Sequence, residues 1–241
     1  MGYMKGIVLA GGRGTRLAPF TKLIKKELLP VYDKPLIYYP LKTLKDSGIT
    51  DVVIVSDPKN IQSFLDVIGE GEDLGMKIQY AIQNKQLGMS HAVYQAKTFI
   101  EKGESVAVIA GDNIFDENFE MVVRGFTEGA VIAVTEVKDP SRFGVVSFDG
   151  DVVTKIVEKP KEPETNWAAV GFYLYDGTVF DKIEKLNPSA RGEYEITDVN
   201  NMYIGDGVMR CVKMEGKWFD AGTFDSLLEA SNYFADLKNK K

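Results

Sequence analysis

The sequence predicts an α/β fold, in which a Rossmann-like, doubly wound, mostly parallel sheet carries a mixed or antiparallel extension. In residues 5–110, short apolar runs typical of buried strands alternate with segments of helical period. After residue 130, strand-like runs follow one another with short turns between them. Alternating strands and helices imply parallel pairing through right-handed crossovers, whereas strands joined by short turns imply antiparallel pairing.

The first half is expected to hold four strands with helices between them. Strands are predicted at residues 5–10, 51–55, 76–83 and 105–110. Helices are predicted at residues 35–47, 58–68 and 88–100. Gly48 is expected to end the first helix, because glycine readily adopts the left-handed conformation that follows a helix. Pro40 is expected to kink that helix.

The second half is expected to be richer in strands. Strands are predicted at residues 130–137, 144–148, 152–157, 168–175 and 208–214, and helices at residues 194–204 and 224–237. Asp149-Gly150 is a turn signal between two of these strands. The chain contains no repeat, linker or low-complexity tract, so residues 1–241 are predicted to form a single domain.

Composition excludes several classes of protein. The chain has 241 residues, with 44% hydrophobic and 27% charged residues, which is ordinary for a globular protein. A net charge of −6 argues against a nucleic-acid surface, which needs clustered positive charge. The single cysteine, Cys211, excludes an intramolecular disulfide. No signal segment or membrane-length apolar run is visible, so we expect no membrane partner and a cytoplasmic protein.

A glycine-rich loop follows the first predicted strand. Gly11, Gly12 and Gly14 allow backbone N–H groups to converge on an anion. Thr15, Arg16, Lys25 and Lys26 then supply a hydroxyl group and positive charge. We interpret the segment as a cradle for a triphosphate, with a simple tight turn as the alternative.

Two familiar nucleotide motifs fit this loop poorly. A dinucleotide fingerprint would need a third glycine where Leu17 stands. It would also need an acidic residue about 20 positions on, and the next strand ends only near Asp57. A P-loop would need a Gly-Lys-Ser/Thr sequence, which is absent.

Two aspartates are candidate metal ligands. Asp112 follows the strand at 105–110, and the carboxyl ends of parallel strands share one edge of a sheet. Asp112 is therefore expected to face the glycine loop, where a carboxylate could hold Mg²⁺ beside phosphate oxygens. A helix N-cap is the alternative for Asp112. Asp220 is the best second ligand, or else a turn residue.

Other polar residues remain ambiguous from the sequence. The segment Glu158-Lys159-Pro160 stands on a proline-stiffened turn, and Arg191 lies in another turn. Each is either a ligand contact or a solvated charge. His91, the only histidine, would have to support any histidine chemistry alone. We expect it to be a helix residue near the ligand rather than a catalyst.

Taken together, these motifs resemble the signature of the sugar-1-phosphate nucleotidyltransferase family. The resemblance rests first on Gly11-Gly12-x-Gly14-Thr15-Arg16-Leu17, Pro19-x-Thr21, Lys26 and Leu29-Pro30. Further segments are similar to the short form of its glucose-1-phosphate thymidylyltransferase branch: residues 30–40, 111–115, 158–163 and 188–198. The resemblance runs nearly end to end.

The resemblance implies a Mg²⁺-dependent reaction of dTTP with glucose 1-phosphate that gives dTDP-glucose and pyrophosphate. Residues 1–130 would bind the nucleotide and residues 131–241 the sugar phosphate. The implied catalytic residues are Arg16, Lys26 and Asp112, and the implied Mg²⁺ ligands are Asp112 and Asp220. The implied substrate-binding residues are Leu9, Gly11, Gly12, Gly14, Thr15, Gln83, Gly88, Asn113, Gly144, Glu158, Lys159, Ala169, Tyr173 and Arg191. A homo-oligomer is compatible with the sequence.

The choice of nucleotide stays open at this stage. The Gln83 amide offers a donor and an acceptor that match thymine or uracil, and Gly88 would let backbone groups reach the same base edge. Neither senses the 5-methyl group or the 2′ position. Residues 86–92 also depart from the Asp-Gly-Leu-Ala-Gln-Ala that is common in thymidylyltransferases. Uridylyl transfer, a nicotinamide-dependent oxidoreductase and a non-catalytic nucleotide-sugar sensor are the alternatives.

Overall fold

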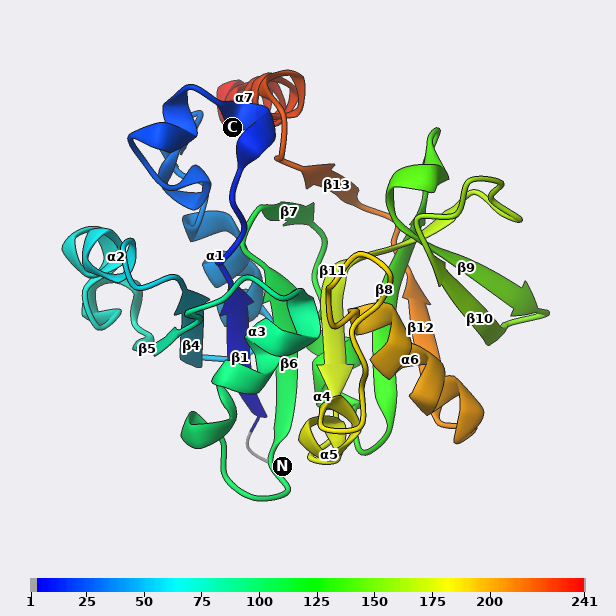
Figure 1. The fold of residues 1–241 in the computed structure, drawn as a ribbon. Helices are drawn as coiled ribbons and strands as arrows, with labels where there is room; N and C mark the ends of the chain where they lie inside the picture. Colours follow the sequence, from blue (N-terminus) through cyan, green and yellow to red (C-terminus); the bar gives the residue numbers. More distant parts are fainter. Residues whose placement is uncertain (1–3, 241) are drawn as a thin grey trace.

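Nine strands form one sheet in the computed structural model, which describes residues 4–240. Their order is β10-β9-β11-β6-β1-β4-β5, with β8 paired to β11 and β12 paired to β8 (Figure 1). The strands are β1 (Met4–Leu9), β4 (Asp51–Ser56), β5 (Lys77–Ile82), β6 (Ser105–Ala110), β8 (Ala130–Glu136), β9 (Gly144–Asp149), β10 (Val152–Glu158), β11 (Trp167–Tyr175) and β12 (Met209–Lys213).

The sheet has the predicted parallel part and mixed extension. β1 pairs in parallel with β4 and β6, so that Ile7 lies opposite Val53 on one side and Val108 on the other. β4 in turn pairs in parallel with β5. β11 is antiparallel to β6, β8 and β9, and β9 and β10 form an antiparallel hairpin. The predicted fold class is therefore confirmed.

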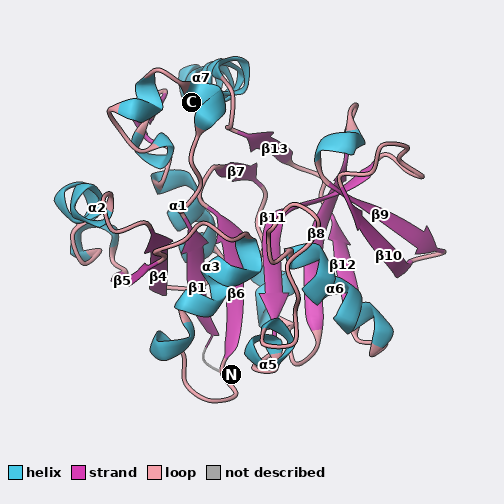
Figure 2. Cartoon of the chain, in the orientation of Figure 1, coloured by secondary structure: helices cyan, strands magenta, loops and turns pink. Residues whose placement is uncertain are grey.

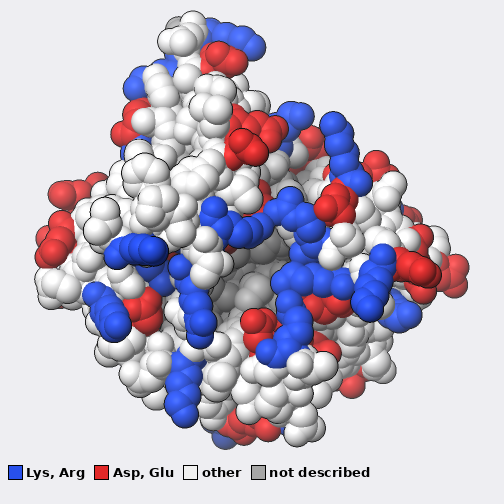
Figure 3. Space-filling model, turned by 45° about the horizontal axis from the view of Figure 1, so that its top comes forward, with Lys and Arg blue, Asp and Glu red and all other residues white. Residues whose placement is uncertain are grey.

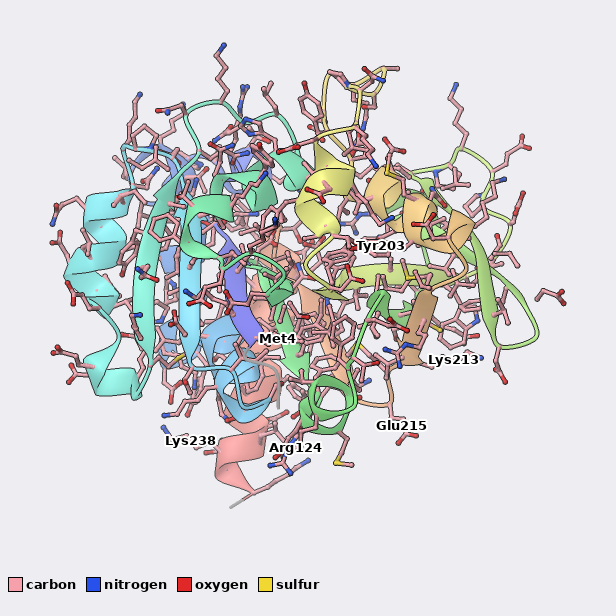
Figure 4. The ribbon with its side chains drawn as sticks, turned by 90° about the horizontal axis from the view of Figure 1, so that it is seen from below. Met4, Arg124, Tyr203, Lys213, Glu215 and Lys238 are labelled. Atoms are coloured by element: carbon pink, nitrogen blue, oxygen red, sulfur yellow. The ribbon has the colours of Figure 1, made fainter. Side chains whose placement is uncertain are left out.

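Helices cover both faces of the sheet (Figure 2). They are α1 (Tyr38–Asp46), α2 (Ile61–Ile68), α3 (Met89–Gln95), α4 (Glu120–Arg124), α5 (Val179–Ile183) and α6 (Ile196–Gly205). A further helix, α7 (Phe224–Asn239), packs in a separate cluster with Val31, Tyr39 and Phe219 beyond the end of the sheet. Because strand side chains alternate between faces, Ile7 packs in the core beneath α3, α5 and α6, while Val8 packs in the core beneath α1, α2 and α4. Figure 4, seen from below, shows α5 and α6 on one side of the sheet and α1 and α4 on the other.

The start of α1 differs from the prediction. Lys34–Pro35 forms a short strand, β3, which pairs with β2 (Pro30–Val31), and the helix begins only at Tyr38. Pro40 therefore lies in the first helical turn, where backbone N–H groups have no intrahelical partner, and the expected kink has no cause. Gly48 follows the helix with φ of 86°, as predicted.

A small second sheet was not predicted. β7 (Asn113–Asp116) and β13 (Lys217–Asp220) pair antiparallel, with Asn113 opposite Asp220. Asp112 therefore precedes a strand, and its alternative reading as a helix N-cap is wrong. Two four-residue strands, about a hundred residues apart, are too short to produce a periodic sequence signal. Their pairing brings Asp220 to the end of β6.

Three further expectations concern the third helix, membrane-crossing helices and the division at residue 130. The helix predicted at residues 88–100 ends at Gln95 and continues as a short 3₁₀ turn, Lys97–Phe99. None of the helices described within residues 4–240 is long and apolar enough to cross a membrane. The division at residue 130 remains a prediction, because strands from both sides of it share the same sheet.

Candidate active site

A cavity of about 650 Å³ lies beyond the carboxyl ends of β1 and β6. Figure 3, with the top of Figure 1 turned forward, shows Lys and Arg side chains gathered around a hollow on this face. Ten of the predicted site residues line the cavity: Arg16, Asp112, Asn113, Gly144, Glu158, Lys159, Ala169, Tyr173, Arg191 and Asp220. They come from seven separated segments of the chain, and the fold brings them together.

A second hollow, of about 370 Å³, lies on the side of the glycine loop. Gly12 and Lys26 line it, together with Lys25 and Gln86. The Lys26 ammonium group forms an ion pair with Asp112, which lines the larger cavity. This ion pair therefore lies between the two hollows.

The glycines of the loop are required by close approaches. Gly14 has φ of 62°, in the left-handed region that favours glycine. A Cβ added to Gly11 would lie 2.3 Å from the Gln83 Oε1 atom, and one added to Gly12 would lie 3.3 Å from Lys26 Nζ. The backbone of the loop thus runs directly against both side chains.

Structural contacts fix both ends of the loop. The carbonyl oxygen of Leu9, at the end of β1, accepts a hydrogen bond from Gly111 N at 2.9 Å. Thr15 begins the 3₁₀ turn that carries Arg16. Lys25 Nζ donates to the Gly12 carbonyl oxygen at 2.9 Å and to Asp57 Oδ2 at 2.8 Å. Lys25 therefore stabilises the loop through these two contacts, and its charge is already paired with Asp57.

Lys26 lies between two carboxyl groups. Burial alone would lower its pKa, but the negative charges of Asp112 and Glu27 outweigh burial and raise the pKa. Glu27 is 1% exposed, and its Oε1 lies 3.8 Å from Lys26 Nζ. Among the described residues, neither of its carboxyl oxygens has a hydrogen-bond partner. Burial raises the pKa of Glu27 to about 7, against the charges of Lys26 and Lys25. Lys26 is therefore held in its charged form.

Asp112 and Asp220 have opposite electrostatic environments. Burial would raise the pKa of Asp112, but the neighbouring Lys26 lowers it overall. Burial and the negative charge of Asp112 raise the pKa of Asp220, despite Arg16 at 3.8 Å and Arg142 at 3.3 Å. Two carboxylates that repel each other at the mouth of a sheet form a donor set suited to a divalent cation.

The donor set favours Mg²⁺ over a metal held mainly by protein. Within residues 4–240, no group of three or more His, Cys, Asp or Glu residues could hold a metal ion. Mg²⁺ is bound in many phosphate sites by one or two carboxylates, with phosphate oxygens and water as the other ligands. Asp112 and Asp220 fit that pattern.

Asn113 holds this corner of the cavity in place. Its Nδ2 donates to Asp112 Oδ1 at 3.0 Å, and its Oδ1 accepts from Trp218 Nε1 at 2.7 Å and from Gly171 N at 3.2 Å. The oxygen of the side chain is thus engaged twice within the protein, and one N–H of its amide orients Asp112.

Arg191 and Glu158 meet on the opposite wall. Arg191 Nη2 donates to Glu195 Oε2 at 2.7 Å and to Glu158 Oε1 at 3.4 Å. Glu158 Oε2 accepts from Thr197 Oγ1 at 2.6 Å, and Gly144 leaves room for this carboxylate. The Glu195 hydrogen bond raises the pKa of Arg191, although burial opposes it.

Lys159 has a strained backbone next to these groups. Its φ of 44° lies in the left-handed region, which is costly for a residue with a side chain and is tolerated mainly at functional positions. Its backbone N donates to the Phe143 carbonyl oxygen at 2.9 Å, which holds the turn. Tyr173 and Ala169, both on β11, complete this wall, and burial raises the pKa of the Tyr173 hydroxyl.

Gln83 and Gly88 lie together beside the glycine loop. Gln83 Nε2 donates to the Gly88 carbonyl oxygen at 3.4 Å and lies 3.0 Å from His91 Nδ1. Gly88 has φ of 99°, and a Cβ there would lie 2.6 Å from the Tyr194 carbonyl oxygen. His91 is on α3, as expected, and contacts a predicted ligand-binding residue.

The structure adds residues that the motifs did not indicate. Arg142 ends a short turn before β9 and reaches Asp220, and Thr197 begins α6 and reaches Glu158. Glu27 contributes a third acidic group near Lys26. Arg142 stands in an ordinary polar segment and Glu27 in a charged run, so their signals are weak, whereas Thr197 lies in the segment 188–198 that resembles the family but was not singled out there.

The fold is an α/β sheet with a cavity lined by charged residues beside the end of β6. The sequence matches the profile of the family described as nucleotidyl transferase over residues 5–236. The chain belongs to this family.

Individual proteins extend the comparison. The chain is 43% identical to the glucose-1-phosphate thymidylyltransferase of Neisseria gonorrhoeae, over 98% of this chain and 84% of that protein. It is 44% identical to the enzyme of the same name from Mycolicibacterium smegmatis, over 98% of this chain and 83% of that protein. A crystal structure of a candidate glucose-1-phosphate thymidylyltransferase from Bacillus anthracis, in complex with sucrose, superposes with a TM-score of 0.91 at 42% identity, covering 95% of this chain and 94% of that one.

Proposed function

We propose that this chain transfers the thymidylyl group of dTTP to glucose 1-phosphate, giving dTDP-glucose and pyrophosphate. The observation that carries the proposal is the position of the Lys26–Asp112 ion pair, between the glycine-loop hollow and the larger cavity. The nucleotidyl group passes from the triphosphate to the sugar phosphate, so its phosphorus must lie where the binding sites of the two substrates meet. The choice of these two substrates is supported by the printed names of relatives that are 43% and 44% identical.

The cationic residues divide between the two substrates. Arg16 and Lys26 lie beside the aspartates and would contact the triphosphate. Lys159 and Arg191 line the far wall of the cavity and would hold the sugar phosphate. Glu195 would fix the direction of the Arg191 guanidinium, because it accepts hydrogen bonds from both Nε and Nη2.

The reaction needs charge stabilisation more than it needs a base. A sugar phosphate is already largely ionised at neutral pH and can attack the α-phosphorus directly. The obstacles are repulsion between two anions and the charge that grows on the leaving pyrophosphate. Positioned cations act on both obstacles. The reaction is therefore a direct displacement without a covalent enzyme intermediate.

Asp112 and Asp220 would hold the divalent cation of this reaction. When bound, Mg²⁺ would neutralise part of the phosphate charge and align the phosphate oxygens. Both ligand side chains are held in position, since Asn113 orients Asp112 and the β7–β13 pairing positions Asp220. Lys26 keeps the charge of Asp112 balanced before a cation binds.

A substrate matrix tests the proposal. The purified chain is assayed for pyrophosphate release with dTTP, UTP, CTP, ATP and GTP against several sugar 1-phosphates, with and without Mg²⁺. The highest kcat/KM is expected for dTTP with glucose 1-phosphate, and only with Mg²⁺. A clear preference for UTP would assign the chain to uridylyl transfer instead. Absence of transfer from every nucleotide would contradict an enzymatic role.

A further inference from the structure

Gln83 is held in one orientation by its neighbours. It is 3% exposed, and the nitrogen of its carboxamide lies 3.4 Å from the Gly88 carbonyl oxygen and 3.0 Å from His91 Nδ1. A backbone carbonyl oxygen can only accept a hydrogen bond, so the end of the amide that faces Gly88 must be the nitrogen. This contact distinguishes the two ends of the amide, which otherwise have nearly the same shape.

The orientation of Gln83 fixes the hydrogen-bonding state of His91. Because Gln83 Nε2 is a donor, His91 Nδ1 accepts from it, which places the ring proton on Nε2. Gln95 Nε2 lies farther from the ring, 3.5 Å from His91 Nε2, and it donates to the His91 carbonyl oxygen at 3.1 Å. Burial lowers the pKa of His91, which favours this neutral form. The ring stacks on Tyr194 with centroids 6.3 Å apart and planes inclined by 26°, and Tyr194 N donates to the Leu87 carbonyl oxygen at 2.7 Å. The acceptor on His91 is therefore held in place.

The other end of the amide faces the nucleotide loop. Gln83 Oε1 lies against Gly11, 2.3 Å from the position that a Cβ would occupy. Within residues 4–240, no group donates a hydrogen bond to this oxygen. Both N–H groups of the amide are engaged, one with His91 and one with Gly88. Gln83 therefore offers a ligand an acceptor and no donor.

We infer that His91 is a positioning residue for base selection, which together with the Gly88 carbonyl oxygen holds the Gln83 carboxamide so that only its oxygen faces the glycine loop. This inference rests on the proposed function, in which Gln83 contacts the base. Thymine and uracil carry a hydrogen-bond donor at N3, whereas cytosine carries an acceptor at the same ring position. An acceptor held opposite N3 attracts the first two bases and repels the third. The arrangement favours thymine and uracil over cytosine. It does not distinguish thymine from uracil, because it involves no contact with the 5-methyl group.

A base that approaches the Gln83 oxygen must pass the glycine loop. Gln86 Nε2 donates to the Gly11 carbonyl oxygen, and Gln86 Oε1 accepts from Arg13 Nε at 2.8 Å. We expect a base that approaches the Gln83 oxygen along the loop to meet this contact. Gln86 is therefore expected to influence the affinity for all nucleotides, while His91 influences the choice between them.

Equilibrium binding tests the inference without requiring turnover. Dissociation constants for dTTP, UTP and CTP are measured by calorimetry for the wild type and three variants. His91→Phe keeps an aromatic ring against Tyr194 and removes the acceptor. His91→Asn restores an acceptor close to the position of Nδ1. Tyr94→Phe is the matched control, because Tyr94 lies on the same helix and its hydroxyl group donates to Glu184 Oε1.

The expected pattern is a change in the ratio of affinities. In His91→Phe the preference for dTTP over CTP falls roughly tenfold, the effect of one buried hydrogen bond. The ratio of dTTP to UTP stays unchanged, because both bases carry the N3 donor. His91→Asn returns the dTTP-to-CTP ratio to within about threefold of the wild type, and Tyr94→Phe leaves it unchanged.

Three results would overturn the inference. They are an unchanged dTTP-to-CTP ratio in folded His91→Phe, a His91→Asn variant that matches His91→Phe, or an equal effect of Tyr94→Phe. If His91→Phe does not fold, His91→Leu, which also lacks the acceptor, takes its place. Failure of the proposed function and failure of this inference give different results. The first appears as absence of transfer in the wild type, and the second appears in the dissociation constants, which do not depend on transfer.

Discussion

Lys26 and Asp112 form an ion pair although 86 residues separate them in the chain. Lys26 follows the glycine loop, and Asp112 follows β6, so the pair joins the two neighbouring parallel strands at their carboxyl ends. Asp220 lies on the far side of Asp112 and shares its environment. A divalent cation held by both aspartates would have to share Asp112 with Lys26. A bound triphosphate, with oxygens for both cations, would resolve that competition.

Lys26→Ala is expected to lower turnover by about a hundredfold or more, which is the scale of losing one charge contact in a transition state. Lys22→Ala is the matched control, because Lys22 is an exposed lysine of the same segment and belongs to neither hollow. Steady-state rates with dTTP and glucose 1-phosphate measure both variants. A folded Lys26→Ala variant within threefold of the wild type would remove Lys26 from the reaction.

Glu195→Gln is expected to weaken the binding of the sugar phosphate. Arg191 donates from Nε and Nη2 to the two oxygens of Glu195, so the amide removes the charge and one acceptor of that pair. The KM for glucose 1-phosphate should rise roughly tenfold, while the KM for dTTP changes little. Initial rates over a grid of both substrate concentrations give the two values. An equal rise in both KM values would contradict the assignment of the two substrates to different walls of the cavity.

Gly11→Ala is expected to impair nucleotide binding, because its Cβ would overlap Gln83 Oε1 at 2.3 Å. Either the loop or the Gln83 side chain must move, and the KM for dTTP should rise at least roughly tenfold. Gly205→Ala serves as the control, since a Cβ at Gly205 has no atom within 4 Å and its backbone is helical. If the two variants bind dTTP equally well, the close approach has no role in binding.

Asp176→Asn is expected to destabilise the protein in a pH-dependent way. Partial burial would raise the pKa of Asp176, but hydrogen bonds from Thr178, Gly129 and Tyr203 lower it overall. A lowered pKa stabilises the folded state above the unfolded value of about 3.9, and this stabilisation is lost as the pH falls through the folded value.

The free energy of unfolding of Asp176→Asn should be about 1–2 kcal/mol below that of the wild type at pH 7, as expected for hydrogen bonds to a charged group. Urea unfolding at pH 7, and at the lowest pH at which both proteins fold, measures the difference. The difference should shrink at low pH. A constant difference would mean that the carboxylate charge contributes nothing.

The parallel half of the fold could be predicted because its signals are local. Strands such as β1 and β6 are continuous apolar runs, and the glycine loop follows β1 directly. The position of Asp112 then follows from the rule that parallel strands end at a common edge. These features need no knowledge of distant contacts.

The rest of the site depends on pairings between distant segments. Asp220 reaches Asp112 only through the β7–β13 sheet, whose strands are too short for a periodic pattern. Arg142 reaches Asp220 from a turn that carries no distinctive motif. The burial of Glu27 and the fixed orientation of Gln83 arise from packing, which composition and spacing do not encode.

The central claim is that the loop and the cavity act together in one direct displacement. The most direct measurement is the incorporation of labelled pyrophosphate into dTTP, with Mg²⁺, in the presence and absence of glucose 1-phosphate. Incorporation is expected only when glucose 1-phosphate is present, because no nucleotidyl-enzyme forms. Incorporation without the sugar phosphate, or none in its presence, would contradict the claim.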